Sequence, residues 1–85
     1  MIHQLKIKRS YFSDILYSRK TFEVRKNDRG FQTGDFLGLN EVDENNIETG
    51  RCMLVRVSDV FDDPDYCKDG YVIMSIQNIN IIGGV

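Results

Sequence analysis

The sequence predicts a small, mainly β domain, with about five short strands forming a barrel or a strongly curved sheet and one short helix near the N-terminus. Five short segments alternate between apolar and polar residues, one early segment has helical spacing, and Gly, Asn and Asp separate the segments. The 85 residues are enough for one domain, residues 1–85. A sheet of this size needs protected edges, and closure into a barrel protects them.

The first two elements follow directly from the spacing of apolar residues. Residues 2–8 (IHQLKIK) alternate and predict a strand whose one face carries His3, Leu5 and Ile7. Ser10 fits a helix N-cap. The next residues, YFSDILYS, place apolar side chains at i, i+1, i+4 and i+5, which predicts a helix over about residues 11–17.

The second strand is expected over residues 21–26 (TFEVRK). Its alternation suggests that Phe22 and Val24 point inward and that Thr21, Glu23 and Arg25 share the outer face. Turns are expected at residues 27–30 (NDRG) and at residues 33–35 (TGD).

Three further strands are expected at residues 36–42, 51–60 and 71–76. The first two are joined by a hairpin loop containing ENN and TG, and the last two by an acidic loop, residues 61–70 (FDDPDYCKDG). The tail QNINIIGGV could extend the last strand, with its Gly-Gly as an end signal, or it could pair elsewhere. Because that tail is apolar, a monomer and a weak homodimer both stay open, and no protein partner is identified.

Composition narrows the classes of protein. The N-terminus, MIHQLKIKR, lacks the apolar segment of a signal peptide, and no run of about 18 apolar residues could span a membrane, so we expect a cytoplasmic protein without a membrane partner. Cys52 and Cys67 are then expected as reduced thiols. One His and two scattered Cys do not make a structural zinc site, and no metal or cofactor is expected.

Charge is divided along the chain. Residues 1–30 carry eight Lys or Arg and three Asp or Glu, whereas residues 31–85 carry three and ten, although the whole chain has a net charge of only −2. This asymmetry hints at an anionic partner for the basic half. Proteins that cover a long stretch of duplex are usually basic overall, so a small anionic or single-stranded ligand is the better expectation.

The basic half contains one polar constellation, in the segment SRKTFEVRKNDR at residues 18–29. Glu23 and Arg25 are two residues apart on a strand, about 6.5–7 Å, and Lys20 stands at the preceding corner. Arg supplies a planar fork, Lys a point charge, and Glu an acceptor for an exocyclic amine. The alternative is a solvated strand face, whose Glu–Arg pair contributes about 0–1 kcal/mol.

The run S-R-K-T-F-E-V-R resembles the G-x-K-x-x-E-x-R signature of ASCH domains (activating-signal-cointegrator homology) in the PUA-like superfamily. Lys20, Glu23 and Arg25 match it, and Ser18 stands where Gly is usual. The opening H-x-L-K-I, the run K-T-F-E-V-R-K-N-D-R-x-F-x-x-G-D and the closing K-D-G-Y-V-I-x-S-I are similar to a compact bacterial and phage branch of this group. The likeness covers most of the chain, from His3 to Ile76.

The resemblance implies a small β-barrel whose cleft is lined by Lys20, Glu23 and Arg25 and binds RNA or a nucleotide-like ligand, including a modified nucleoside. Phosphate contacts are expected from the adjoining turn, at Lys26, Asn27 and Arg29. Tyr71 or Phe31 could stack on a base, although both could equally belong to the core. His3 is a weaker candidate for the same cleft.

Two other function classes stay open. One ASCH branch hydrolyses the acetyl amide of acetylated cytidine through a Lys, which aligns with Lys20, and a Thr nucleophile, which is replaced here by Glu23. Glu23 could instead act as a general base for water beside Lys20. In a ribonuclease-like reaction, His3 would be the acid–base group. The replaced nucleophile favours binding over catalysis. The third class is a protein-interaction domain.

Overall fold

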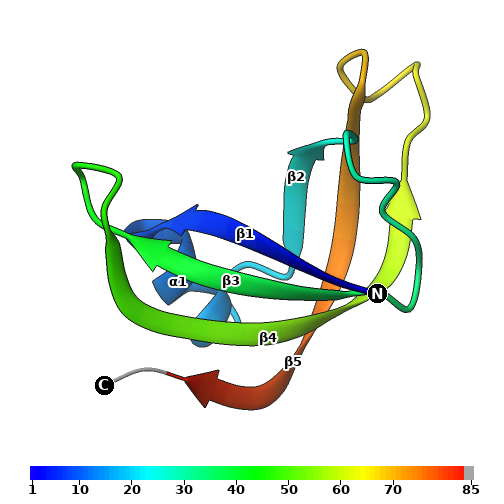
Figure 1. Cartoon of the computed structure of the whole chain (residues 1–85). Coiled ribbons are helices and arrows are strands. Elements are labelled where there is room, and N and C mark those ends of the chain that lie inside the picture. Colours follow the sequence, from blue (N-terminus) through cyan, green and yellow to red (C-terminus); the bar gives the residue numbers. More distant parts are fainter. Residues whose placement is uncertain (84–85) are drawn as a thin grey trace.

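Within residues 1–83, one mixed sheet and one helix make up the fold (Figure 1). The computed structural model describes the backbone of residues 1–83 and the side chains of residues 1–79. The elements in chain order are β1 (Ile2–Lys8), α1 (Arg9–Leu16), β2 (Phe22–Lys26), β3 (Phe36–Val42), β4 (Glu48–Phe61) and β5 (Tyr71–Gly83). The five strands lie in the order β1-β3-β4-β5-β2, with β1 parallel to β3 and the other neighbours antiparallel.

The sheet curls into a half-barrel, so its two edge strands, β1 and β2, approach one another. The curvature comes from β4 and β5, which are long and bend along their length. Their pairing shifts register between Leu54 and Val55 and again between Val57 and Asp59. Such irregularities bend strands and increase their twist, which lets two long strands carry the sheet around the core.

The core fills the concave side of the half-barrel, where α1 lies next to β1 and β3. Phe12 and Ile15 are the buried side chains of the helix. The strands contribute alternate residues, as period-2 segments with one covered face do. The described core comprises Leu5, Ile7, Phe12, Ile15, Phe31, Leu37, Leu39, Met53, Val55, Val57, Val72, Met74 and Ile76.

The predicted fold class is confirmed: a mainly β domain of five strands with one short N-terminal helix. The strands at residues 2–8 and 36–42 have the predicted bounds, and the last two strands are longer than predicted. The tail extends β5 to Gly83 and pairs with β4 of the same chain. Residue 84, the second Gly of the end signal, lies outside the described residues.

The helix begins earlier than predicted, at Arg9. Its N-cap is Lys8 rather than Ser10, and no side chain caps it. The reason is that β1 runs straight into the helix: Lys8 is still extended, with φ −61° and ψ 144°, and no loop intervenes. Cys52 and Cys67 are free thiols. Within residues 1–83, no helix has the length and apolar character needed to span a bilayer.

The prediction for the two faces of β2 was wrong. Glu23 is only 3% exposed, whereas Phe22 and Val24 are 44% and 50% exposed. Glu23 pairs in register with Met74 and Arg25 with Val72, both of which are buried on the inner face. An ionised carboxylate can occupy that face because two cations neutralise it and donate hydrogen bonds to it, as described next.

Candidate functional site

The corner between α1 and β2 sets the position of Lys20. Ser18 adopts a left-handed conformation, with φ 61°, directly after the helix. The backbone N–H groups of Arg19 and Lys20 both donate to the carbonyl of Asp14, at 2.8 and 3.0 Å. Left-handed residues after a helix are usually Gly because a Cβ is strained there. The chain therefore makes a tight corner here with a Ser in the left-handed position.

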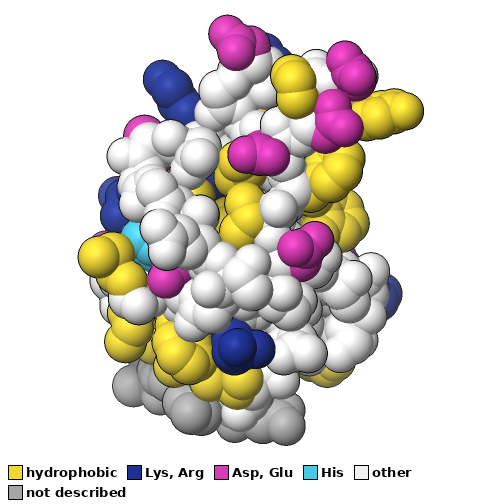
Figure 2. All heavy atoms as spheres, turned by 90° about the vertical axis from the view of Figure 1, so that its right-hand side faces the viewer, with side chains coloured by type: hydrophobic (Ala, Val, Ile, Leu, Met, Phe, Trp, Pro, Cys, Tyr) yellow, Lys and Arg dark blue, Asp and Glu magenta, His cyan; other side chains and the backbone are white. Residues whose placement is uncertain are grey.

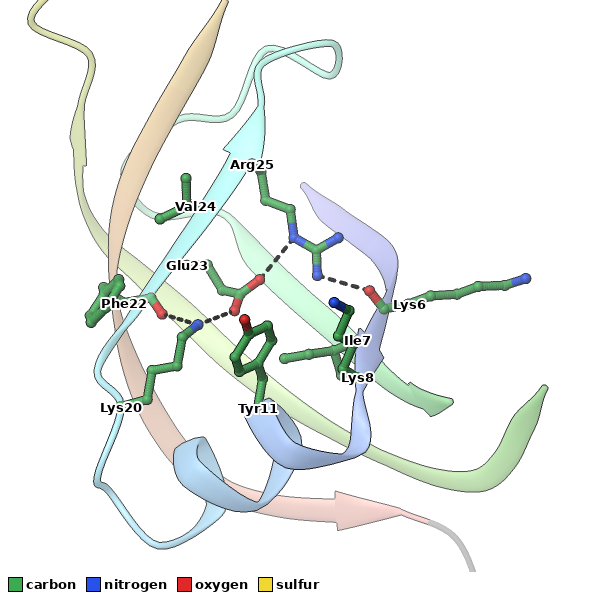
Figure 3. A pocket seen from close by; sticks show the side chains of 9 residues that line it. All are labelled: Lys6, Ile7, Lys8, Tyr11, Lys20, Phe22, Glu23, Val24 and Arg25. Atoms are coloured by element: carbon green, nitrogen blue, oxygen red, sulfur yellow. Dashed lines mark hydrogen bonds and ion pairs between the residues drawn. The ribbon is translucent and has the colours of Figure 1, made fainter. Parts of the chain in front are cut away.

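Glu23 is the centre of a paired ion cluster at this corner (Figure 3). Lys20 Nζ donates to Glu23 Oε1 at 2.6 Å and to the carbonyl of Phe22 at 2.7 Å. Arg25 Nε donates to Glu23 Oε2 at 2.8 Å. Each carboxylate oxygen thus has one cationic partner, which compensates for the loss of water around it.

Arg25 also links the two edges of the half-barrel. Its Nη2 donates to the carbonyl of Lys6 on β1 at 2.9 Å, although β1 and β2 are not hydrogen-bonded neighbours in the sheet. Edge strands present unpaired backbone groups along their free side. The Arg25 guanidinium gives one of these groups, the Lys6 carbonyl, a hydrogen bond. Because β1 and β2 do not pair directly, a gap lies between the two strands.

A pocket of about 520 Å³ occupies this gap. Its volume lies within the range of about 300–1,000 Å³ that is usual for small-molecule sites. Tyr11 of α1 stands beside Lys20 and Glu23, and the Lys20 Nζ lies 5.1 Å from the centre of the Tyr11 ring (Figure 3). The lining residues are Lys6, Ile7, Lys8, Tyr11, Lys20, Phe22, Glu23, Val24 and Arg25.

The cations of the cluster keep hydrogen-bonding capacity. A lysine ammonium has three N–H donors and a guanidinium five. Lys20 uses two of its donors and Arg25 two, so one and three, respectively, have no partner among the described residues. Lys8 adds a further positive charge beside the Tyr11 ring, with its Nζ 5.8 Å from the ring centre. The pocket can therefore hold an anionic or acceptor-rich group next to an aromatic ring.

His3 and Phe31, two other predicted candidates, lie together away from this pocket. His3 is buried, its Nε2 donates to Asp35 Oδ2 at 2.8 Å, and its ring meets that of Phe31 edge-on with centres 4.8 Å apart. The hydrogen bond from His3, followed by that from the N–H of Gln32, holds the pKa of Asp35 below its usual value. These contacts anchor the start of β3 and do not reach the pocket lining.

The other predicted contacts also lie outside the pocket lining. Lys26 ends β2, and Arg29 is exposed on the following turn. Asn27 supports that turn, because its side chain accepts from the N–H of Phe31 at 3.2 Å. Tyr71 is half-buried at the start of β5, with Lys68 Nζ 5.4 Å above its ring. The structure thus brings Lys20, Glu23 and Arg25 together and leaves these four apart from them.

Sequence reasoning missed Tyr11 and Lys8 as parts of the site. Tyr11 was placed on the apolar helical face, yet it is exposed. Both residues could have been included from their position in the sequence. They flank the point where a predicted strand ends and the predicted helix begins, so their positions imply that they lie together at one end of the sheet. The sequence does not say that Lys20 comes back to this same end of the sheet; only the tertiary fold places it beside Lys8 and Tyr11.

Residues 2–76 match a domain family described as a domain of unknown function, DUF3850. A relative from Escherichia phage P2, described as an uncharacterized 12.9 kDa protein in the GpA 3′ region, is 38% identical over 73 residues. The match covers 86% of this chain and 65% of the phage protein, so it spans less than two thirds of that relative.

Proposed function

The chain belongs to the DUF3850 family, and we propose that it is a binding module for a nucleotide or a short single-stranded RNA, held in the pocket between β1 and β2. The observation that carries this proposal is the ion cluster. Two cations are fixed on a buried carboxylate and retain unused donors. One of them, Lys20, lies beside the exposed Tyr11 ring, and the pocket has room for one nucleoside.

In this proposal the three motif residues have different roles. Glu23 is a positioning residue, because it is buried and each of its oxygens already accepts from a cation. Lys20 and Arg25 contact the ligand through their unused N–H groups, which suit the oxygens of a phosphate or of a base edge. Together, the residues match the K-x-x-E-x-R pattern of ASCH domains, and we propose that the pocket is the equivalent of the ASCH cleft.

Tyr11 supplies the surface on which a base would stack. Its ring is exposed, and its neighbours Lys8 and Lys20 would lie close to a stacked nucleotide. Stacking of a base on an aromatic side chain contributes about 1–3 kcal/mol. Recognition would therefore combine stacking at Tyr11 with ionic contacts at Lys20 and Arg25.

The experiment titrates the protein with the four ribonucleoside monophosphates, acetylated cytidine and a six-nucleotide RNA, and measures Kd by calorimetry. We expect Tyr11→Leu and Lys20→Met each to weaken binding by about tenfold. Lys8→Ala and Lys26→Ala form a matched pair, since each removes one exposed lysine at the end of a strand. Lys8→Ala should weaken binding of a mononucleotide, and Lys26→Ala should not.

The same pair tests the predicted turn contacts. If phosphates of the RNA contact the turn that follows β2, Lys26→Ala and Arg29→Ala weaken binding of the RNA. Binding of the mononucleotide should stay unchanged, because it does not reach that turn. Affinity for the RNA should also fall as salt rises, because phosphate contacts release counterions. The proposal is wrong if no ligand in the panel distinguishes the wild type from Lys20→Met.

The hydrolase alternative is tested in the same samples. Glu23 is only 3% exposed and each of its oxygens already accepts from a cation, so little of the carboxylate is open to an attacking water. This favours binding over catalysis. Release of acetate from acetylated cytidine, at a rate above that of a Glu23→Gln control, would reverse that preference.

A further inference from the structure

A row of apolar side chains crosses the outer face of the sheet, away from the core. Val24, Ile73 and Phe61 lie in register on three adjacent strands, because Val24 pairs with Ile73 and Ile73 with Phe61. Neighbouring strands are about 4.8 Å apart, so the three side chains are in contact range. Val24 and Phe61 are 50% and 42% exposed.

The row is extended at its Phe61 end by the loop between β4 and β5. Tyr66, 79% exposed, lies with its ring centre 6.4 Å from that of Phe61. Phe22, in the next row of β2, is also exposed. We call this surface the outer patch: Phe22, Val24, Phe61, Tyr66 and Ile73. Contiguous exposed apolar surface with a polar border is typical of protein interaction sites.

Carboxylates border the outer patch. Asp59 is next to the row on β4, and Asp62, Asp65 and Asp69 are exposed on the loop that carries Tyr66. None of these four forms an ion pair with any residue whose side chain the structure describes. Figure 2 shows acidic and apolar side chains interleaved over the end of the molecule where this loop lies.

The negative charge at the border of the outer patch limits which classes of molecule can bind there. Unpaired carboxylates repel nucleic acid and anionic membrane surfaces. They also disfavour a second copy docked patch to patch, because a twofold axis would bring the acidic borders of both copies together. A basic protein segment complements both features of the surface. Its Lys or Arg side chains would face the carboxylates, and an apolar side chain would pack on the rings of Phe61 and Tyr66.

We propose that the outer patch docks a basic segment of another protein, with one or two large apolar side chains on Phe61 and Tyr66 and Lys or Arg beside Asp62 and Asp65. The Phe61 and Tyr66 end of the outer patch is separate from the nucleotide pocket, because neither residue lines that pocket. Phe22 and Val24 border both surfaces, so the test uses only residues of the β4 end and its loop.

The probe is a library of random twelve-residue peptides, selected on the wild-type protein and depleted on the Phe61→Ser, Tyr66→Ser double variant. Selected peptides are then synthesised, and their Kd values are measured by fluorescence anisotropy. We expect peptides with net positive charge around one or two large apolar residues. The double variant should weaken their binding at least about tenfold, as loss of an aromatic anchor does.

A second pair of substitutions separates docking from folding. Asp62→Lys and Asp65→Lys change only exposed loop side chains and keep the apolar row. Together they should also weaken binding by about tenfold, and raised salt should weaken wild-type binding, because both act on the charge contacts. Lys8→Ala, on the β1 side of the pocket beside Tyr11, should change these Kd values by less than about twofold, since sites without shared contacts act independently.

Three results would each overturn the proposal. The library could contain no peptide that prefers the wild type to the double variant. The selected peptides could be acidic or neutral. Sedimentation could show a wild-type dimer that the double variant loses, in which case a second copy of the chain is the occupant. If Phe61→Ser unfolds the protein, the proposal is judged on the Asp62→Lys, Asp65→Lys variant alone, by whether it weakens peptide binding.

Discussion

Glu23 and Asp35 are both buried carboxylates with a cationic or cation-forming partner, yet only one of them belongs to a candidate binding site. Asp35 accepts from His3, from the N–H of Gln32 and, at 3.4 Å, from the N-terminal ammonium of Met1. The His3 ring is itself buried against Phe31, so it offers nothing to a ligand. The partners of Glu23, Lys20 and Arg25, line a pocket and have donors to spare.

The difference teaches that burial of an acid does not by itself mark a site. Both carboxylates accept hydrogen bonds from positively charged or N–H donors, as most buried carboxylates do. What distinguishes them is where the partners lie: Lys20 and Arg25 line a pocket and can hold the acid and a ligand at once, whereas neither His3 nor the N-terminal ammonium lines that pocket. Three changes, from the largest expected effect to the smallest, test how far this contrast holds.

Glu23→Ala should have the largest effect on stability. Lys20 and Arg25 each have less than a quarter of their side-chain surface exposed, and the substitution removes the carboxylate that neutralises them. We expect the free energy of unfolding to fall by about 2–3 kcal/mol, measured by urea denaturation. The control is Glu44→Ala, which removes an exposed carboxylate paired only at 3.9 Å with Arg9 and should cost less than about 0.5 kcal/mol. Equal effects of the two substitutions would mean that Glu23 does not hold the cluster together.

Asp35→Asn should cost less, about 1–2 kcal/mol at neutral pH, because an amide oxygen still accepts but without charge. It should also change the pH dependence. The pKa of Asp35 is lowered from 3.8 in the folded state, chiefly by the bond from His3, so its contribution is complete above that value and is lost as pH falls through the folded pKa. Stability of the wild type should thus drop below about pH 4 more steeply than that of the variant. Parallel acid-unfolding curves would contradict this.

Ser18→Gly should have the smallest effect and the opposite sign. Ser18 has φ 61°, where a Cβ is strained and Gly is not. We expect thermal unfolding to report a gain of about 0.5–1 kcal/mol. Ser18→Ala keeps the Cβ and serves as the control, with no gain expected. A loss of stability in Ser18→Gly would show that the Ser hydroxyl, rather than the backbone, sets the corner.

Much of the fold could be predicted because period-2 segments are local patterns. Strands at residues 2–8 and 36–42 were found with their bounds, as both have one fully covered face. The helix start was misjudged because Ser10 is a good N-cap residue, but the chain leaves β1 without a loop. The start of β4 was predicted too late because Thr49-Gly50 is typical of a turn, and β5 was predicted too short because its pairing with β4 slips between residues 78 and 81.

The sequence by itself determined that Glu23 and Arg25 share one face of a strand and that Lys20 stands at the preceding corner. Only the tertiary structure decided that this face points into the half-barrel. Alternation defines two faces of a strand but not which one is covered, and the apolar pair Phe22 and Val24 suggested the wrong one. The ionic face could be buried because β2 is an edge strand opposite β1, where Arg25 reaches the Lys6 carbonyl and the cluster neutralises itself.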